Sequence, residues 1–174
     1  NNVQVFTEDG TFLRKFSSVN GDPREIAVDS NGSLYVGDAA DLVNVFDKSG
    51  NKLRTINGIS GDPWGLSVYG NRLAVGNSHD SVHKIRIYDL NGTLIREFGE
   101  WGEASGQFKK PISVDYDSVG NIWVCDHENH RIQVFDGDGT FIRAIGSYAE
   151  SPDLYNPTAF VLDSSGNLIV SDTR

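Results

Sequence analysis

Residues 110–145 read KPISVDYDSVGNIWVCDHENHRIQVFDGDGTFIRAI, and this stretch decides the fold. It contains four short runs rich in apolar, β-branched and aromatic residues, and turns with Asp and Gly separate the first run from the second and the third run from the fourth. Such runs are typical of strands, and no helical stripe of useful length is present. A glycine in the fourth place of each turn fits a hairpin that needs a positive φ at one position. The stretch therefore predicts one four-stranded antiparallel sheet.

The same pattern recurs along the chain. Two more full copies run from Asp22 to Ile56 and from Asp62 to Phe98, and a half copy occupies residues 156–174. Residues 1–16, NNVQVFTEDGTFLRKF, match the missing second half. The aligned prolines Pro23, Pro63, Pro111 and Pro157 are spaced by 40, 48 and 46 residues, and the path through both termini back to Pro23 takes the remaining 40 of the 174. Four-stranded units with this period predict the blades of a β-propeller.

The expected fold is therefore an all-β propeller in one domain, residues 1–174, with four blades' worth of sequence. The blades are expected at about 22–56, 62–98, 110–145, and 156–174 plus 1–16. We expect the N-terminal segment to pair with the C-terminal strands and close the last blade, which removes open edges. Two alternatives stay open, namely a larger ring cut within a blade and a strand-exchanged oligomer.

The stretch from Asn129 to Phe135, N-H-R-I-Q-V-F, closely resembles the defining part of the NHL repeat. The chain thus resembles NHL-repeat β-propeller proteins, including the tripartite-motif/NHL proteins. The second repeat departs most, with Asn77 in place of the usual aspartate and a longer loop at 81–84. The resemblance implies binding of a protein partner or of RNA, and a cytoplasmic location if the chain is part of a tripartite-motif/NHL protein. Relatives include a peptide-amidating lyase, so the resemblance does not choose among these tasks.

Composition narrows the function classes. The net charge of −9 and the pI near 4.8 disfavour an overall phosphate-binding surface. No apolar run is long enough to span a bilayer. The single cysteine, Cys125, lies in an apolar run and is expected to be a small buried side chain rather than a nucleophile.

Polar residues that recur in every repeat are expected to have structural roles. Structural contacts recur in each repeat, whereas a binding or catalytic site usually occurs once in a protein. Asp38, Asp126, Asp172 and Asn77 share one position and are expected to accept backbone N–H groups in the next turn. Arg14, Arg54, Arg96 and Arg143 share another position and are expected to be solvated residues that discourage edge pairing. The histidines His79, His83, His127 and His130 lack the convergent ligands of a zinc site. We therefore expect no metal, no cofactor and no catalytic constellation.

The positions where the repeats differ carry the functional prediction. The candidate ligand-binding face consists of Arg24, Trp64, Lys109, Lys110, His127, His130, Arg131, Tyr155 and Asn156. Trp, Tyr and Arg are the side chains that dominate interface energies, and the Arg and Lys residues predict a locally positive face. The leading hypothesis is a non-catalytic module that binds a protein or peptide. The alternatives are single-stranded RNA binding, an isolated or engineered scaffold without a ligand, and a metal-dependent lyase or hydrolase.

Overall fold

The computed structural model describes residues 1–17, 21–59, 61, 63–77, 82–146 and 154–173. Its described residues form an all-β fold with three four-stranded antiparallel sheets. The first sheet contains β3 (Pro23–Val28), β4 (Leu34–Asp38), β5 (Leu42–Phe46) and β6 (Lys52–Ile56). The second contains β7 (Pro63–Tyr69), β8 (Arg72–Asn77), β9 (Lys84–Asp89) and β10 (Leu94–Phe98). The third contains β11 (Pro111–Tyr116), β12 (Ile122–Asp126), β13 (Arg131–Phe135) and β14 (Phe141–Ile145).

Two further hairpins flank these blades. β1 (Asn2–Phe6) pairs with β2 (Phe12–Ser17), and β15 (Ala159–Leu162) pairs with β16 (Leu168–Ser171). The only helix among the described residues is the 3₁₀ turn η1 (His127–Asn129), which is too short to cross a membrane. The predicted propeller architecture of four-stranded antiparallel blades is thus confirmed.

The Asp–Gly turns set the registers of the hairpins. Asp89 accepts hydrogen bonds from the backbone N–H groups of Asn91 and Thr93, at 2.9 and 2.8 Å, and Gly92 has a φ of 97°. The same pattern recurs at Asp29, Asp47, Asp117, Asp136 and Asp163. Glycine populates positive φ without steric strain, so the sequence repeat becomes a geometric repeat.

The hydrophobic core lies between the blades. Tyr35 and Val45 of the first sheet pack with Leu73 and Tyr88 of the second, and the second packs on the third in the same way. At the ends of the series, Val3 of β1 contacts the sheet β3–β6, and Phe160 of β15 contacts the sheet β11–β14. Stacking gives each blade a second buried face, which a single sheet lacks.

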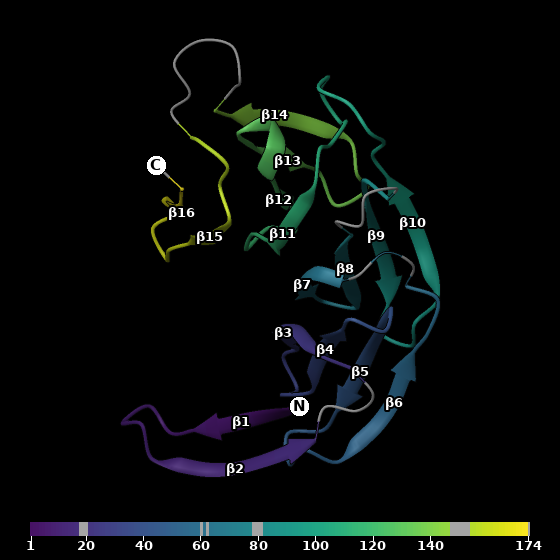
Figure 1. Cartoon of the computed structure of the whole chain (residues 1–174), viewed down its shortest axis with the longest axis vertical. Coiled ribbons are helices and arrows are strands. Elements are labelled where there is room, and N and C mark those ends of the chain that lie inside the picture. The colour runs from purple at the N-terminus through teal and green to yellow at the C-terminus, as the bar shows by residue number, and fades with distance from the viewer. Residues whose placement is uncertain (18–20, 60, 62, 78–81, 147–153, 174) are drawn as a thin grey trace.

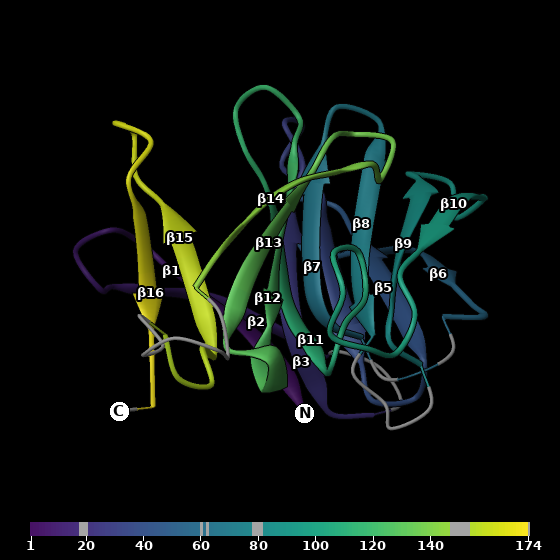
Figure 2. The same cartoon turned by 90° about the horizontal axis from the view of Figure 1, so that it is seen from above.

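The expected closure of the last blade within one chain is absent. β1–β2 and β15–β16 are separate two-stranded sheets. Figure 1 shows an open arc with the N-terminal hairpin at one end and the C-terminal hairpin at the other, and Figure 2 shows the same strands from above. The physical reason is that each hairpin packs on its neighbouring complete blade, and the curvature of the three blades keeps the two ends apart.

Candidate functional site

One end of every blade carries both the start of the innermost strand and the connection between the second and third strands. Backbone hydrogen bonds join the two segments in the first, third and last blades, from Ala39 N to Asp22 O, His127 N to Lys110 O, and Thr173 N to Tyr155 O. We call this end the loop face. It comprises the described residues in 21–24, 39–41, 61–64, 82–84, 99–112, 127–131, 154–158 and 172–173, and all nine predicted site residues lie on it.

Arg24 and Trp64 occupy the same position on adjacent innermost strands, β3 and β7. Each follows the aligned proline directly, as Ile112 does in β11. The Arg24 guanidinium carbon lies 4.7 Å from the centroid of the Trp64 ring, a cation–π contact that bridges two blades. Trp64 remains 40% exposed, so the contact orients the indole without covering it.

The two predicted histidines of the third blade contact backbone atoms of the segment that leads into the C-terminal hairpin. The Nδ1 atom of His127 lies 2.9 Å from the carbonyl oxygen of Pro157. His130 is buried and adopts a left-handed conformation, with φ of 54°. Its Nδ1 accepts a hydrogen bond from Asn156 N at 2.9 Å, and its ring stacks on Tyr155 at 4.8 Å. Tyr155 itself stays exposed.

The guanidinium group of Arg131 also forms its hydrogen bonds within the chain. Its Nε donates to Asp126 Oδ2 at 2.8 Å, and its other nitrogens donate to the carbonyl oxygens of Glu103, Ala104 and Gln107. Asp126 is fully buried and also accepts from Lys109 N, Asn129 and Gln133. Burial raises the pKa of Asp126, and the hydrogen bonds from Asn129, Lys109 N and Arg131 oppose this shift. Asp126 and Arg131, which flank η1, thus connect it by hydrogen bonds to the segment 99–110.

The predicted positive character of this face is largely neutralised. Lys109 Nζ donates to Glu103, and Lys110 Nζ lies 3.8 Å from Glu128. Arg131 is paired with Asp126. Lys109, Lys110 and Arg131 therefore each have a carboxylate partner, which leaves less charge for phosphate groups.

The sequence prediction missed Trp101. This residue is 65% exposed, and Lys109 Nζ lies 5.3 Å from its ring centroid. It lies in the long connection between β10 and β11, where Trp101 and Phe108 form an isolated bridge. The available signal was the 48-residue spacing from Pro63 to Pro111, which marks an insertion at this point.

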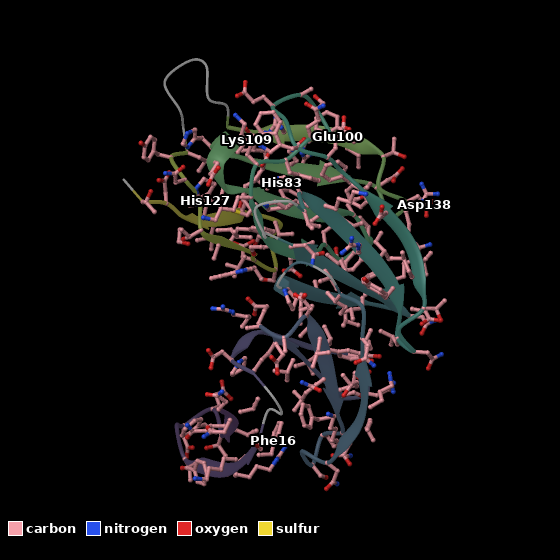
Figure 3. The ribbon with its side chains drawn as sticks, turned by 45° about the vertical axis from the view of Figure 1, so that its right-hand side comes forward. Phe16, His83, Glu100, Lys109, His127 and Asp138 are labelled. Atoms are coloured by element: carbon pink, nitrogen blue, oxygen red, sulfur yellow. The ribbon has the colours of Figure 1, made fainter. Side chains whose placement is uncertain are left out.

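Figure 3 shows Lys109, His83 and His127 in one region, whereas Asp138, in the turn between β13 and β14, lies away from them. His83 Nδ1 accepts a 3.3 Å hydrogen bond from Lys110 N. His79 lies outside the described residues. Within the described part of the chain, no three His, Cys, Asp or Glu side chains gather as metal ligands would.

The recurring aspartates accept backbone N–H groups as expected, but only Asp38 accepts one from the following turn, whereas Asp126 and Asp172 accept from the segment that precedes the innermost strand. Asp38 accepts from Ala40 N at 2.9 Å, and Asp172 accepts from Tyr155 N at 2.7 Å. Asn77 differs by donating to Gly61 O at 3.1 Å. The expectation for two of the recurring arginines was wrong. Arg14 and Arg54 donate to the carbonyl oxygens of Lys48 and Leu90 in the next blade, because the outermost strand of one blade lies beside that turn.

The innermost strands enclose a cavity of about 460 Å³ along the concave side of the arc. Its polar lining includes Glu25, Ser67 and Asp115. Ser67 donates to Asp115 at 2.6 Å, and burial raises the pKa of Glu25. Among the described residues of this lining, these side chains do not form the nucleophile–base–orienter arrangement of covalent catalysis.

Comparison with known proteins supports the description of the fold. Residues 108–135 match the family model of the NHL repeat. A protein of unknown function from Bacteroides caccae superposes with a TM-score of 0.68 and 13% identity, covering 99% of this chain and 61% of that one. The WD40 β-propeller domain of Doa1 superposes with a TM-score of 0.73 and 16% identity, covering 99% of this chain and 54% of that one. The chain thus spans roughly three-fifths and just over half of the lengths of these two structures.

At these identities the structural likeness establishes the fold, and the family match identifies the repeat. The match covers the stretch that carries Asn129, His130 and Arg131, so the resemblance noted in the sequence is confirmed there. The chain is a β-propeller chain of four-stranded blades that contains an NHL repeat.

Proposed function

We propose that the chain is a non-catalytic interaction module that binds a peptide or protein segment on its loop face. The observation that carries the proposal is the set of exposed aromatic rings, Trp64, Trp101 and Tyr155, each held by a neighbouring side chain on that face. A ring held in place loses little conformational freedom on binding, so it contributes more of its contact energy to affinity. β-Propellers of this kind commonly serve as interaction modules, which supports the proposal.

The charge pattern favours a peptide over RNA. Binding of single-stranded nucleic acid combines aromatic stacking with a positive groove along the backbone. Here Lys109, Lys110 and Arg131 are paired with carboxylates, and the whole chain carries a net charge of −9. The expected ligand is therefore an extended segment with apolar side chains that cover the exposed rings.

A peptide selection tests this proposal. The chain is immobilised and panned against a phage-displayed random peptide library, and the selected peptides are titrated against variants. Trp64→Ala and Trp101→Ala are each expected to weaken binding by at least about 10-fold. Val119→Ala, at an exposed position in the turn at the opposite end of β11, is the control and leaves affinity unchanged.

Circular dichroism checks that each variant is folded. Selected peptides that bind both tryptophan variants as tightly as the parent chain would contradict the proposal. A gel shift with random RNA that weakens between low and high salt, and is lost in Trp64→Ala, would favour the RNA alternative instead.

A further inference from the structure

The segment 99–110 carries the exposed Trp101 and joins β10 to β11. An isolated β-bridge within the segment joins Trp101 to Phe108, and Phe108 N donates a hydrogen bond to Glu100 O at 2.8 Å. Phe108 is fully buried, and its ring centroid lies 5.5 Å from that of Phe135. The core therefore fixes Phe108, whereas Trp101, which is 65% exposed, needs other contacts to fix its position.

Side chains of the third blade supply contacts to the backbone of this segment. The side chains that make them are Asp126, Asn129, Arg131 and Gln133. The backbone groups that they contact, at 2.7 to 2.9 Å, are the carbonyl oxygens of Gly102, Glu103, Ala104 and Gln107 and the N–H groups of Gly106 and Lys109. A segment with few backbone hydrogen bonds of its own is thus held by side chains of one neighbouring blade.

Asp126 is the centre of this set of side chains. Its carboxylate is fully buried, and Oδ2 accepts hydrogen bonds, at 2.8 to 2.9 Å, from Asn129, Arg131 and Gln133. A buried carboxylate is stable only where donors replace its lost water. The same bonds that satisfy Asp126 therefore orient the three side chains that reach the segment 99–110.

The set does not recur in the other complete blades. The strand registers place Leu42 of the first blade and Lys84 of the second at the position of Arg131. A leucine offers no donor, and a lysine lacks the planar fork that lets one guanidinium group bind several oxygens. A blade can therefore form without this arrangement, which distinguishes it from the contacts that repeat along the chain.

Lys109 connects the set to the indole ring. Its backbone N–H donates to Asp126 Oδ1 at 2.7 Å, and its Nζ lies 5.3 Å from the ring centroid of Trp101. The same Nζ donates to the carboxylate of Glu103, whose carbonyl oxygen accepts from Arg131. Printed contacts thus run without a break from the buried Asp126 to the exposed ring.

We propose that Arg131 and Asp126 are positioning residues for the loop-face site, which hold the segment 99–110 so that Trp101 is presented in one orientation. This inference rests on the proposed function. The sequence prediction placed Arg131 among the ligand contacts, but its side chain is only 11% exposed and binds three carbonyl oxygens and a carboxylate. Arg131 acts on a bound peptide through Trp101, because a ring that is already ordered loses less freedom on binding.

Time-resolved fluorescence anisotropy tests the positioning without a ligand. In a Trp64→Phe background the remaining indoles are Trp101 and Trp123, and Trp123 is 6% exposed. The buried ring reports the tumbling of the whole molecule, so a faster nanosecond component reports motion of Trp101. Arg131→Lys keeps a positive charge beside Asp126 but loses the planar fork, and we expect it to add this fast component.

Two further variants keep the test specific. Arg72→Lys is the matched control, because Arg72 also donates to a backbone oxygen of the third blade, Gly137 O, in the turn between β13 and β14. We expect it to leave the anisotropy decay unchanged. Gln133→Ala removes the bonds to Gln107 O and Gly106 N and leaves Arg131 in place, so it should add the same fast component if Arg131→Lys does not fold.

A double-mutant cycle tests the effect on binding, with a peptide selected on the parent chain as the probe. Arg131→Lys is expected to weaken binding by about 3- to 10-fold in the parent chain and by less than about 2-fold in a Trp101→Ala background, because both substitutions act through one ring. Arg72→Lys should leave the affinity unchanged in both backgrounds. Circular dichroism confirms that each variant is folded.

Specific outcomes would overturn the inference. Losses of affinity that multiply in the double variant would show that Arg131 contacts the peptide itself. An unchanged anisotropy decay in folded Arg131→Lys and Gln133→Ala would show that these side chains do not order Trp101. A fast component in both variants, together with Trp101→Ala that binds the peptide as tightly as the parent chain, would contradict the proposed function but support the role of Arg131 in ordering the ring.

Discussion

The Nδ1 atom of His130 accepts a hydrogen bond from the backbone N–H of Asn156 across the boundary between the third blade and the C-terminal hairpin, at 2.9 Å. Both residues adopt positive φ, 54° for His130 and 47° for Asn156. His83 and Lys110 repeat the relationship one blade earlier, at 3.3 Å. The histidines of the loop connections thus join one blade to the next.

This relationship predicts the effect of substituting His130. His130→Ala removes the acceptor and leaves the Asn156 N–H without this partner, so the free energy of unfolding should fall by about 1–3 kcal/mol. His130→Asn places an oxygen near the position of Nδ1 and should recover part of the loss. Urea denaturation measures both variants, and equal stabilities of the two would contradict this role for Nδ1.

Gly65 should tolerate no side chain. A Cβ at this position would lie 2.7 Å from Val114 N, because β7 and β11 approach closely there. Gly65→Ala is therefore expected to cost about 1–3 kcal/mol, since backbone has to move. Gly76→Ala in the same blade is the control, with its nearest neighbour at 3.4 Å. Thermal unfolding should show a clear drop for the first variant and a smaller change for the second.

Arg54 should contribute stability by linking blades. Arg54→Ala removes the hydrogen bond to Leu90 O, and we expect a loss of about 1 kcal/mol. Lys52→Ala, in the same strand and exposed, should change the free energy of unfolding by less than about 0.5 kcal/mol. Equal effects of the two substitutions in chemical denaturation would show that the bond to Leu90 contributes nothing specific.

Acid should destabilise the fold through the turn aspartates. Backbone hydrogen bonds from Thr93 and Thr140 are the largest causes that lower the pKa of Asp89 and Asp136. A lowered folded-state pKa means that the stabilisation is present above the unfolded value of about 3.9 and is lost as pH falls through the folded value. Asp89→Asn should therefore flatten the loss of stability below about pH 4, as followed by thermal melts across an acid series.

Cys125 should report global unfolding. Its Sγ lies 2.9 Å from Pro157 O, and burial raises the pKa of the thiol. The thiolate is the reactive form, so a thiol reagent at neutral pH should modify the folded chain far more slowly than the chain in denaturant. Rapid modification of the native chain would show that the contact between the third blade and the C-terminal hairpin opens readily.

The sequence alone determined the strands, their turns and the blade pattern, because hydrophobic alternation and Asp–Gly turns act over a few residues. The recurrence of Asp38, Asp126 and Asp172 correctly indicated side chains that accept backbone N–H groups, but only Asp38 accepts one from the turn that follows it. The family resemblance was also contained in Asn129–Phe135.

The tertiary structure decided what depends on contacts between distant segments. The pairing of Lys109 and Lys110 with nearby carboxylates removed most of the expected positive face. Trp101 lies in the long connection between β10 and β11, outside the repeat pattern, so its place on the loop face came only from the structure. The matching halves at residues 1–16 and 156–174 suggested closure, but the packing angle between blades sets the curvature, and this curvature holds the halves apart. The repeats specify which strands are complementary, whereas the packing between blades decides how far apart the two terminal hairpins lie.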